Sequence, residues 1–239
     1  MTDEMTSVKE KNTAIVLAAG QGKRMKSSLQ KQFMLICGKP VLYYSLYEFQ
    51  NSPRIRDIIL VTGEAELDYC RREIVERYGF SKVSRIVAGG KERYHSVYAG
   101  LLACQDTDYV YIHDGARPFV DEGIIERTHA EVLKSGACVA GMPVKDTIKI
   151  ADESGCISYT PNRSLVWMIQ TPQVFSYELV RRAYELQMAD ENPMITDDAM
   201  VVEQMLHRKV RLVEGSYRNI KITTPEDIPM AETLCKKDV

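Results

Sequence analysis

The stretch TAIVLAAG, residues 13–20, decides the fold, because a continuous apolar run leads directly into a glycine. A strand that is apolar at every position is typical of a parallel sheet with both faces covered. The glycine marks a loop at the carboxyl end of the strand, which is where open α/β sheets bind their ligands. We therefore expect this segment to form a central strand followed by a binding loop.

Strands and helices alternate after that segment. Further strands are predicted at 58–62, 83–88, 109–113 and 138–142, with helices around 40–51, 65–78, 93–104 and 121–134. The remaining chain predicts helices around 176–189 and 197–206, strands near 210–213 and 219–223, and a last helix opened by 224–227. Such alternation predicts an α/β fold, Rossmann-like, with a mostly parallel sheet, helices on both faces and right-handed crossovers.

Residues 146–160 break this rhythm. Ile148 and Ile150 alternate with polar neighbours, the turn residues DESG follow at 152–155, and Ile157 and Tyr159 alternate on the far side. This pattern predicts a β-hairpin. A two-stranded ribbon alone is marginally stable in water, so we expect this arm to protrude and to lie against a partner subunit.

Length and composition favour a globular protein. The chain has 239 residues, 45% of them hydrophobic and 27% charged, which is ordinary usage for folded domains. We find no internal repeat and no linker. The sequence predicts a flexible tail at 1–12 and one domain at 13–239.

The charge balance and the apolar pattern exclude several classes of protein. The net charge of −2 provides no global basic field for nucleic-acid binding. The first residues lack the apolar core of a signal peptide, and no apolar run approaches the roughly 20 residues that span a bilayer. Six scattered cysteines without a C-x-x-C pair favour reduced thiols. We expect a cytoplasmic protein without membrane or nucleic-acid partners.

The loop after the first strand is suited to hold a polyphosphate. It carries two glycines, Gly20 and Gly22, and the cations Lys23, Arg24, Lys26 and Lys31. Glycines let backbone N–H groups face an anion, and the cations add charge. Neither a Walker motif nor a dinucleotide fingerprint fits, because Arg24 follows Lys23 and Met25 stands where a glycine is needed.

A second polar cluster, HDGARP at 113–118, follows the strand at 109–113. Its Asp114 and Arg117 should face the same cleft as the first loop. A carboxylate beside a polyphosphate usually needs a cation between them, so Asp114 is a candidate Mg²⁺ contact, direct or through water; a helix cap or turn role for it stays open. We interpret His113 as a packed histidine. A glycine turn at 89–96 leads into another helix.

Several motifs occur together in a fixed order. They are LAAGxGxRM with KQF downstream, HDGARP, PVKDTIK, QTPQxF, ITDDA and NIKITxPED. Together they resemble the 2-C-methyl-D-erythritol 4-phosphate cytidylyltransferase family of the non-mevalonate isoprenoid pathway, from about Thr13 to Cys235. One position departs from the family, which usually has proline where this chain has Gln30. We expect a less rigid loop there.

The resemblance implies transfer of a cytidylyl group from CTP to 2-C-methyl-D-erythritol 4-phosphate, with release of pyrophosphate. Four cations match the family's catalytic positions. Arg24 and Lys31 would stabilise the transition state and pyrophosphate, and Arg163 and Lys221 would position the polyol phosphate. The fold would be a nucleotidyltransferase-type sheet.

The same resemblance implies the substrate contacts and a homodimer. The matching contact residues are Ala18, Ala19, Gly20, Gly22, Gly90, Arg93, Ser96, Asp114, Arg117, Thr147, Thr171 and Thr196. The hairpin arm would embrace a second subunit and bring Thr147 and Arg163 to the partner's cleft. Mg²⁺ would be the cofactor, with Asp114 as its candidate ligand.

Two alternatives stay open at this point. A ribitol 5-phosphate cytidylyltransferase shares the loop and the reaction but differs in the acceptor, although residues 165–170 look more like the methylerythritol family. A regulatory module that senses CTP without turnover would need only ground-state affinity. Release of pyrophosphate with each acceptor distinguishes all three.

Overall fold

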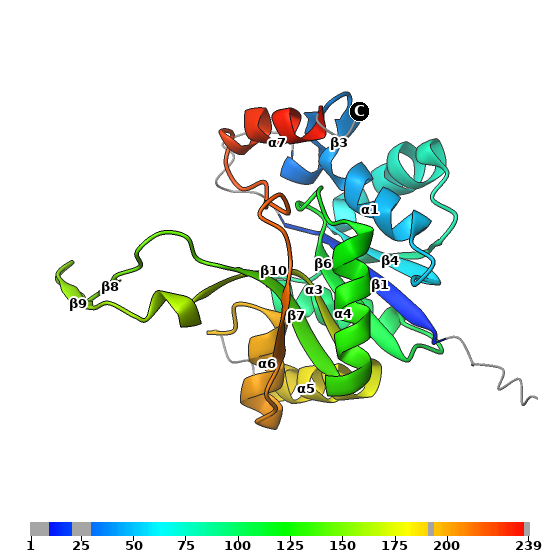
Figure 1. The fold of residues 1–239 in the computed structure, drawn as a ribbon. Helices are drawn as coiled ribbons and strands as arrows, with labels where there is room; N and C mark the ends of the chain where they lie inside the picture. Colours follow the sequence, from blue (N-terminus) through cyan, green and yellow to red (C-terminus); the bar gives the residue numbers. More distant parts are fainter. Residues whose placement is uncertain (1–9, 21–29, 191–193, 237–239) are drawn as a thin grey trace, which may run out of the picture.

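The computed structural model describes residues 10–20, 30–190 and 194–236. A seven-stranded sheet forms the centre, in the order β11-β7-β10-β6-β1-β4-β5 (Figure 1). The strands are β1 (Asn12–Ala18), β4 (Asp57–Thr62), β5 (Val83–Ala88), β6 (Tyr109–Asp114), β7 (Ala137–Pro143), β10 (Trp167–Ser176) and β11 (Arg211–Glu214). The segment at 13–20 thus forms most of a central strand, as predicted.

The sheet is mostly parallel. β1 runs parallel to β4 and β6, β4 to β5, and β11 to β7. β10 alone is antiparallel, and it lies between β6 and β7. The predicted α/β class is confirmed, with one antiparallel strand inserted.

Helices cover both faces of the sheet, because alternate residues of each strand face opposite layers. One face packs α1 (Val41–Asn51), the adjoining helices α2 (Leu67–Tyr69) and η4 (Cys70–Glu76), and α4 (Glu122–Ser135). The other face packs α3 (Arg93–Ala103), α5 (Tyr177–Asp190) and α6 (Asp198–Leu206). In β1, Ala14 and Val16 face the first layer and Ile15 faces the second.

Two features of the sheet differ from the prediction. The sequence analysis does not predict β10, because Gln170, Thr171 and Gln173 interrupt the apolar pattern of this strand with buried polar side chains. The strand predicted near 219–223 is wrong. That segment makes no ladder, and its Ile222 is instead buried in a side cluster with Ile36.

A small hairpin and the last helix lie together at one end of the molecule. The hairpin consists of β2 (Leu35–Ile36) and β3 (Lys39–Pro40), and the helix is α7 (Asp227–Cys235). Figure 1 shows α7 beside β3. Both pack on the side cluster of Ile36, Val41, Ile222 and Ala231, so α7 is held close to the residues that follow the first loop.

The predicted hairpin arm is present. β8 (Ile150–Ala151) pairs antiparallel with β9 (Ile157–Tyr159), and the arm extends away from the domain (Figure 1). Its turn is closed by Asp152, whose Oδ1 accepts hydrogen bonds from the backbone N–H groups of Ser154 and Cys156. Gly155 takes a positive φ of 82°, which favours glycine there.

Candidate active site

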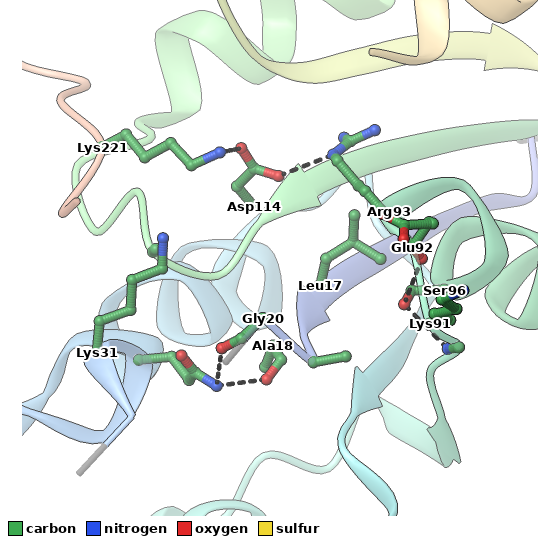
Figure 2. A pocket seen from close by; sticks show the side chains of 14 residues that line it. Leu17, Ala18, Gly20, Lys31, Lys91, Glu92, Arg93, Ser96, Asp114 and Lys221 are labelled. Carbon is green, nitrogen blue, oxygen red and sulfur yellow. Dashed lines mark hydrogen bonds and ion pairs between the residues drawn. The ribbon is translucent and has the colours of Figure 1, made fainter. Parts of the chain in front are cut away.

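A cavity of about 500 Å³ opens at the carboxyl ends of β1 and β6, beside the first turn of α3. Figure 2 shows the side chains around it. It is lined by Leu17, Ala18, Ala19, Gly20, Lys31, Gln32, Gly90, Lys91, Glu92, Arg93, Ser96, Asp114, Ala116 and Lys221. The position agrees with the rule that α/β sheets bind ligands at this edge.

Lys31 reaches the cavity from the short 3-10 helix η2 (Lys31–Phe33). The next residue, Gln32, is buried and fixes this helix to the end of β1. Its Nε2 donates hydrogen bonds to the carbonyls of Ala18, at 2.5 Å, and Gly20, at 3.3 Å. Gln32 was not predicted as a site residue, although it belongs to the KQF motif. It holds the strand end and Lys31 in one place.

The first turn of α3 forms another wall. The backbone N–H of Gly90 donates to Oγ of Ser96 at 3.1 Å. A Cβ at Gly90 would meet Cβ of His95 at 2.3 Å, so this position needs glycine. The amino end of a helix attracts anions, because its backbone N–H groups and its dipole favour negative charge. This wall is therefore suited to a phosphorylated ligand.

Asp114 lies among three cations. Lys221 Nζ is 2.7 Å from its Oδ2, Arg93 Nε is 3.4 Å from its Oδ1, and Arg117 Nε is 3.9 Å from its Oδ2. Burial by itself would raise the pKa of this carboxyl. The charges of Arg93, Lys221 and Arg117 outweigh burial and hold the pKa far below its ordinary value. Asp114 is therefore ionised at neutral pH, and the cluster keeps a surplus of positive charge.

Arg93 is held from behind by a second carboxylate. Its Nη1 and Nη2 donate to the two oxygens of Asp198 at 2.7 and 2.8 Å, and the Tyr184 hydroxyl donates to Oδ1 at 2.5 Å. Burial would lower the pKa of Arg93, but Asp198 and Asp114 raise it above its ordinary value. The sequence prediction does not include Asp198. The signal for it is the ITDDA motif, from which the prediction takes only Thr196.

A chain of hydrogen bonds fixes the backbone at Asp114. The Asp114 N–H donates to Thr171 Oγ1 at 3.1 Å, and this hydroxyl lies 3.0 Å from Nδ1 of His113. Nε2 of His113 lies 3.1 Å from the Arg117 carbonyl, which can only accept, so Nε2 carries the proton. The interpretation of His113 as a packed histidine agrees with its complete burial.

Lys221 lies in a segment outside any strand, and hydrogen bonds of the neighbouring Asn219 hold this segment in place. The nearby Asn219 is fully buried, and its Nδ2 donates to the Thr171 carbonyl at 2.8 Å. Its own carbonyl accepts from Arg117 Nη1 at 2.8 Å. These bonds satisfy groups that a sheet ladder would otherwise pair, and they hold the NIK segment beside β6.

The predicted site residues fall into four groups. Those that line the cavity are Ala18, Ala19, Gly20, Lys31, Gly90, Arg93, Ser96, Asp114 and Lys221. Arg117 and Thr171 lie directly behind Asp114. Thr196 is exposed before α6, and Thr147 and Arg163 are exposed on and beside the arm, away from this cavity. Gly22 and Arg24 lie outside the described residues.

The described residues contain no ready-made metal site. No group of three or more His, Cys, Asp or Glu side chains that could hold one occurs within residues 10–20, 30–190 and 194–236. Asp114 also faces three cations. Mg²⁺ is commonly held by one or two carboxylates together with substrate phosphates and water. The residues therefore fit a metal that arrives with a polyphosphate, and Asp114 is the carboxylate of this cavity that would be available to contact it.

The fold and the cavity define an α/β protein whose site is built for phosphorylated ligands. The sequence matches the family model described as 2-C-methyl-D-erythritol 4-phosphate cytidylyltransferase over residues 12–237. The chain belongs to this family of nucleotidyltransferase enzymes.

Curated relatives of the same name match nearly full length. The protein of Lachnoclostridium phytofermentans is 52% identical over 228 residues, covering 95% of this chain and 97% of the relative. The protein of Lachnospira eligens is 49% identical, covering 94% of this chain and 99% of the relative.

Solved structures agree with the fold. The 4-diphosphocytidyl-2C-methyl-D-erythritol synthase of Anaerococcus prevotii superimposes with a TM-score of 0.84 at 34% identity, covering 95% of this chain and 97% of that chain. The cytidylyltransferase of Thermus thermophilus gives a TM-score of 0.77 at 28% identity, covering 95% and 99%. In the described part of this chain, no helix has the length and apolar character needed to cross a bilayer.

Proposed function

We propose that this enzyme transfers the cytidylyl group of CTP to 2-C-methyl-D-erythritol 4-phosphate. The products are 4-diphosphocytidyl-2-C-methyl-D-erythritol and pyrophosphate, and the step belongs to the non-mevalonate isoprenoid pathway. The observation that carries the proposal is the convergence of Lys31, Arg93 and Lys221, from distant parts of the chain, on one cavity. Family membership supplies the identity of the two substrates.

The chemistry needs charge rather than a general base. A phosphate monoester is largely a dianion at neutral pH, because its second pKa is near 6. It can therefore attack the α-phosphorus of CTP directly, and the obstacle is repulsion between two anions. Positioning and charge stabilisation lower this barrier, as in phosphoryl transfer generally.

The cations divide this work. Lys31, with Arg24 of the preceding loop, would stabilise charge on the transferring and leaving phosphates. Lys221 would hold the attacking phosphate, and its partner Asp114 keeps it beside β6 until the substrate arrives. Arg93, fixed by Asp198, would face the nucleotide. The small residues Ala18, Ala19 and Gly90 leave backbone groups accessible to CTP.

Magnesium would enter with CTP. It would neutralise part of the triphosphate charge, and Asp114 is the carboxylate through which the protein would contact it. Because this carboxylate also faces Lys221 and Arg93, it would contribute less affinity than the phosphates do. We expect little binding of Mg²⁺ to the protein without nucleotide.

The active form is proposed to be a homodimer. The arm and its base expose the apolar side chains of Ile157, Tyr159 and Leu165, which are 65, 57 and 78% exposed. Apolar side chains gathered on a protruding ribbon favour burial against another surface. Thr147 and Arg163, remote from the cavity of their own chain, would then contribute to the partner's site.

We also propose that the enzyme works in the cytoplasm. Both substrates are phosphorylated and do not cross membranes unaided. The six cysteines include no disulfide within the described residues, which include all six. This fits a reducing compartment.

A pyrophosphate-release assay with CTP, Mg²⁺ and either acceptor tests the function. We expect rapid release with 2-C-methyl-D-erythritol 4-phosphate and at least about tenfold lower kcat/KM with ribitol 5-phosphate. Preference for ribitol 5-phosphate would contradict the proposal and identify the enzyme as a ribitol 5-phosphate cytidylyltransferase. Binding of CTP without release in the presence of either acceptor would favour a sensor.

A further inference from the structure

Two cysteines from opposite ends of the chain meet beside the small hairpin. Cys37 occupies the turn between β2 and β3 and is exposed, and Cys235 is the last residue of α7. Cys37 Sγ lies 3.8 Å from the carbonyl oxygen of Glu232, one turn before Cys235 on the same helix. Both cysteines line one cavity of about 650 Å³. The fold therefore brings the two thiols to one place.

Tyr44 joins the two cysteine-bearing segments. Its hydroxyl donates to the carbonyl of Ile36 at 2.7 Å and lies 3.5 Å from Sγ of Cys235. The Cys235 side chain is also near enough to raise the pKa of the Cys37 thiol. Ile36 and Ala231 pack in the same apolar cluster, so the hairpin and helix already contact each other in the reduced protein.

The turn at Cys37 is not explained by backbone preference. Cys37 has a φ of 46° and Gly38 a φ of 80°. Two successive positive φ values favour Asn-Gly or Asp-Gly. A cysteine, which carries a β-carbon, is uncommon in this conformation.

We propose that Cys37 and Cys235 are a dithiol site that low-molecular-weight disulfides oxidise reversibly to an intramolecular disulfide. A thiolate of the pair attacks one sulfur of the small disulfide, breaks its S–S bond and releases one small thiol. The second cysteine then attacks the mixed disulfide and releases the other small thiol. Two electrons pass to the small disulfide, and the two cysteine protons end on the two released thiols.

The new bond would join the segments that carry two site lysines. Lys31 lies in η2, shortly before Cys37, and Lys221 lies in the segment that leads into α7. A disulfide here closes a loop that includes nearly the whole domain, which restricts the unfolded chain strongly. Oxidation would therefore stabilise the association of these two segments.

The reaction should be faster at alkaline pH. The hydrogen bond with Cys235, followed by burial, raises the pKa of the Cys37 thiol. Exchange requires the thiolate. We expect the rate of disulfide formation to increase from pH 7 to pH 9.

The test treats the full-length protein with oxidised glutathione, alkylates the remaining thiols and maps the linked peptides by mass spectrometry. We expect a Cys37–Cys235 link within one chain and a rise in Tm of at least about 5 °C. Dithiothreitol should reverse both. Cys37→Ser and Cys235→Ser should each lose both effects, whereas Cys156→Ser, which changes another exposed cysteine, should keep them.

Several outcomes would overturn the proposal. They are alkylation of both cysteines after oxidation, stable glutathione adducts without a link, a link between two chains, or an equal rise in Tm for Cys37→Ser. Under reducing conditions the Ser variants should have a Tm close to that of the parent protein, which shows that loss of the effect is not unfolding. Neither readout depends on cytidylyl transfer, so failure here leaves the proposed function untouched.

Discussion

The ammonium group of Lys221 lies 2.7 Å from Oδ2 of Asp114, although 107 positions separate the two residues in the chain. Asp114 ends β6, and Lys221 belongs to a segment without regular structure. The same carboxylate also faces Arg93 and Arg117. One negative charge therefore organises three cations at the edge of the sheet where a phosphate would enter.

Replacement of Asp114 by Asn should destabilise the protein by about 3 kcal/mol, or roughly 6–12 °C in Tm, because it leaves largely buried guanidinium groups without their counter-charge. Calorimetry measures this. Glu153→Gln, a neutralisation in the exposed arm turn, is the control and should change the stability by less than about 0.5 kcal/mol. Pyrophosphate should raise the Tm of Asp114→Asn more than that of the parent protein. A Tm within about 1 °C of the parent would contradict this role of Asp114.

Asp198→Asn should weaken CTP binding through Arg93. The substitution removes a charge from the paired hydrogen bonds at 2.7 and 2.8 Å, so Arg93 loses its fixed direction. We expect the KM for CTP to rise at least about tenfold. The matched control is Asp197→Asn, because Asp197 caps α6 and bonds Gln173 rather than Arg93. Equal effects of the two substitutions would exclude the positioning role.

The stability of the protein should decrease between pH 6.5 and about 4. Burial lowers the pKa of His113 from 6.5 to about 4, so the unfolded chain binds more protons than the folded protein in this window. The contribution of His113 to stability therefore increases with pH in this window and is fully present above about pH 6.5. The pKa of Asp114 is depressed in the folded protein, so the stability that this carboxylate contributes is lost only below about pH 4.

Denaturant unfolding at pH 7 and pH 5 checks this expectation. The loss attributable to His113 should be about 2 kcal/mol, since each pH unit contributes about 1.4 kcal/mol while the unfolded group alone is protonated. Burial also lowers the pKa of His129, so His113→Gln should reduce the loss rather than abolish it. An unchanged loss in His113→Gln would refute the assignment.

The parallel part of the fold could be predicted from the sequence because its strands are apolar at nearly every position and its helices are amphipathic. β10 could not, since its buried polar residues Gln170, Thr171 and Gln173 have partners elsewhere in the chain. The segment at 219–223 resembled a strand because Ile220 and Ile222 alternate. Its buried Ile222 instead packs beside β2 and α7.

The site was predictable only where local sequence motifs carry it. Short motifs at strand ends indicated Lys31, Asp114 and Lys221, which the cavity brings together. Gln32 and Asp198 act through partners that only the folded chain places beside them. The approach of Cys37 to Cys235 also depends on the packing of α7 against β2, which no local pattern contains.

A mixture of two inactive variants tests the shared active site. Lys31→Ala damages the cavity of its own chain, and Arg163→Ala would damage the partner's. In a mixed dimer one site then keeps both residues, so subunit exchange should restore about a quarter of the parent activity if the subunits pair at random. The readout is pyrophosphate release before and after exchange, with each variant alone as control. No gain after verified exchange would contradict the contribution of Arg163 to a partner site.

The central claim is that cations converge on two anionic substrates and accelerate their reaction. Its most direct test is the turnover of Lys31→Ala with saturating CTP, Mg²⁺ and 2-C-methyl-D-erythritol 4-phosphate, measured as pyrophosphate release. We predict a decrease in kcat of about 10²–10³, which corresponds to roughly 2.7–4 kcal/mol of lost transition-state stabilisation. A kcat within a few-fold of the parent enzyme would contradict the account.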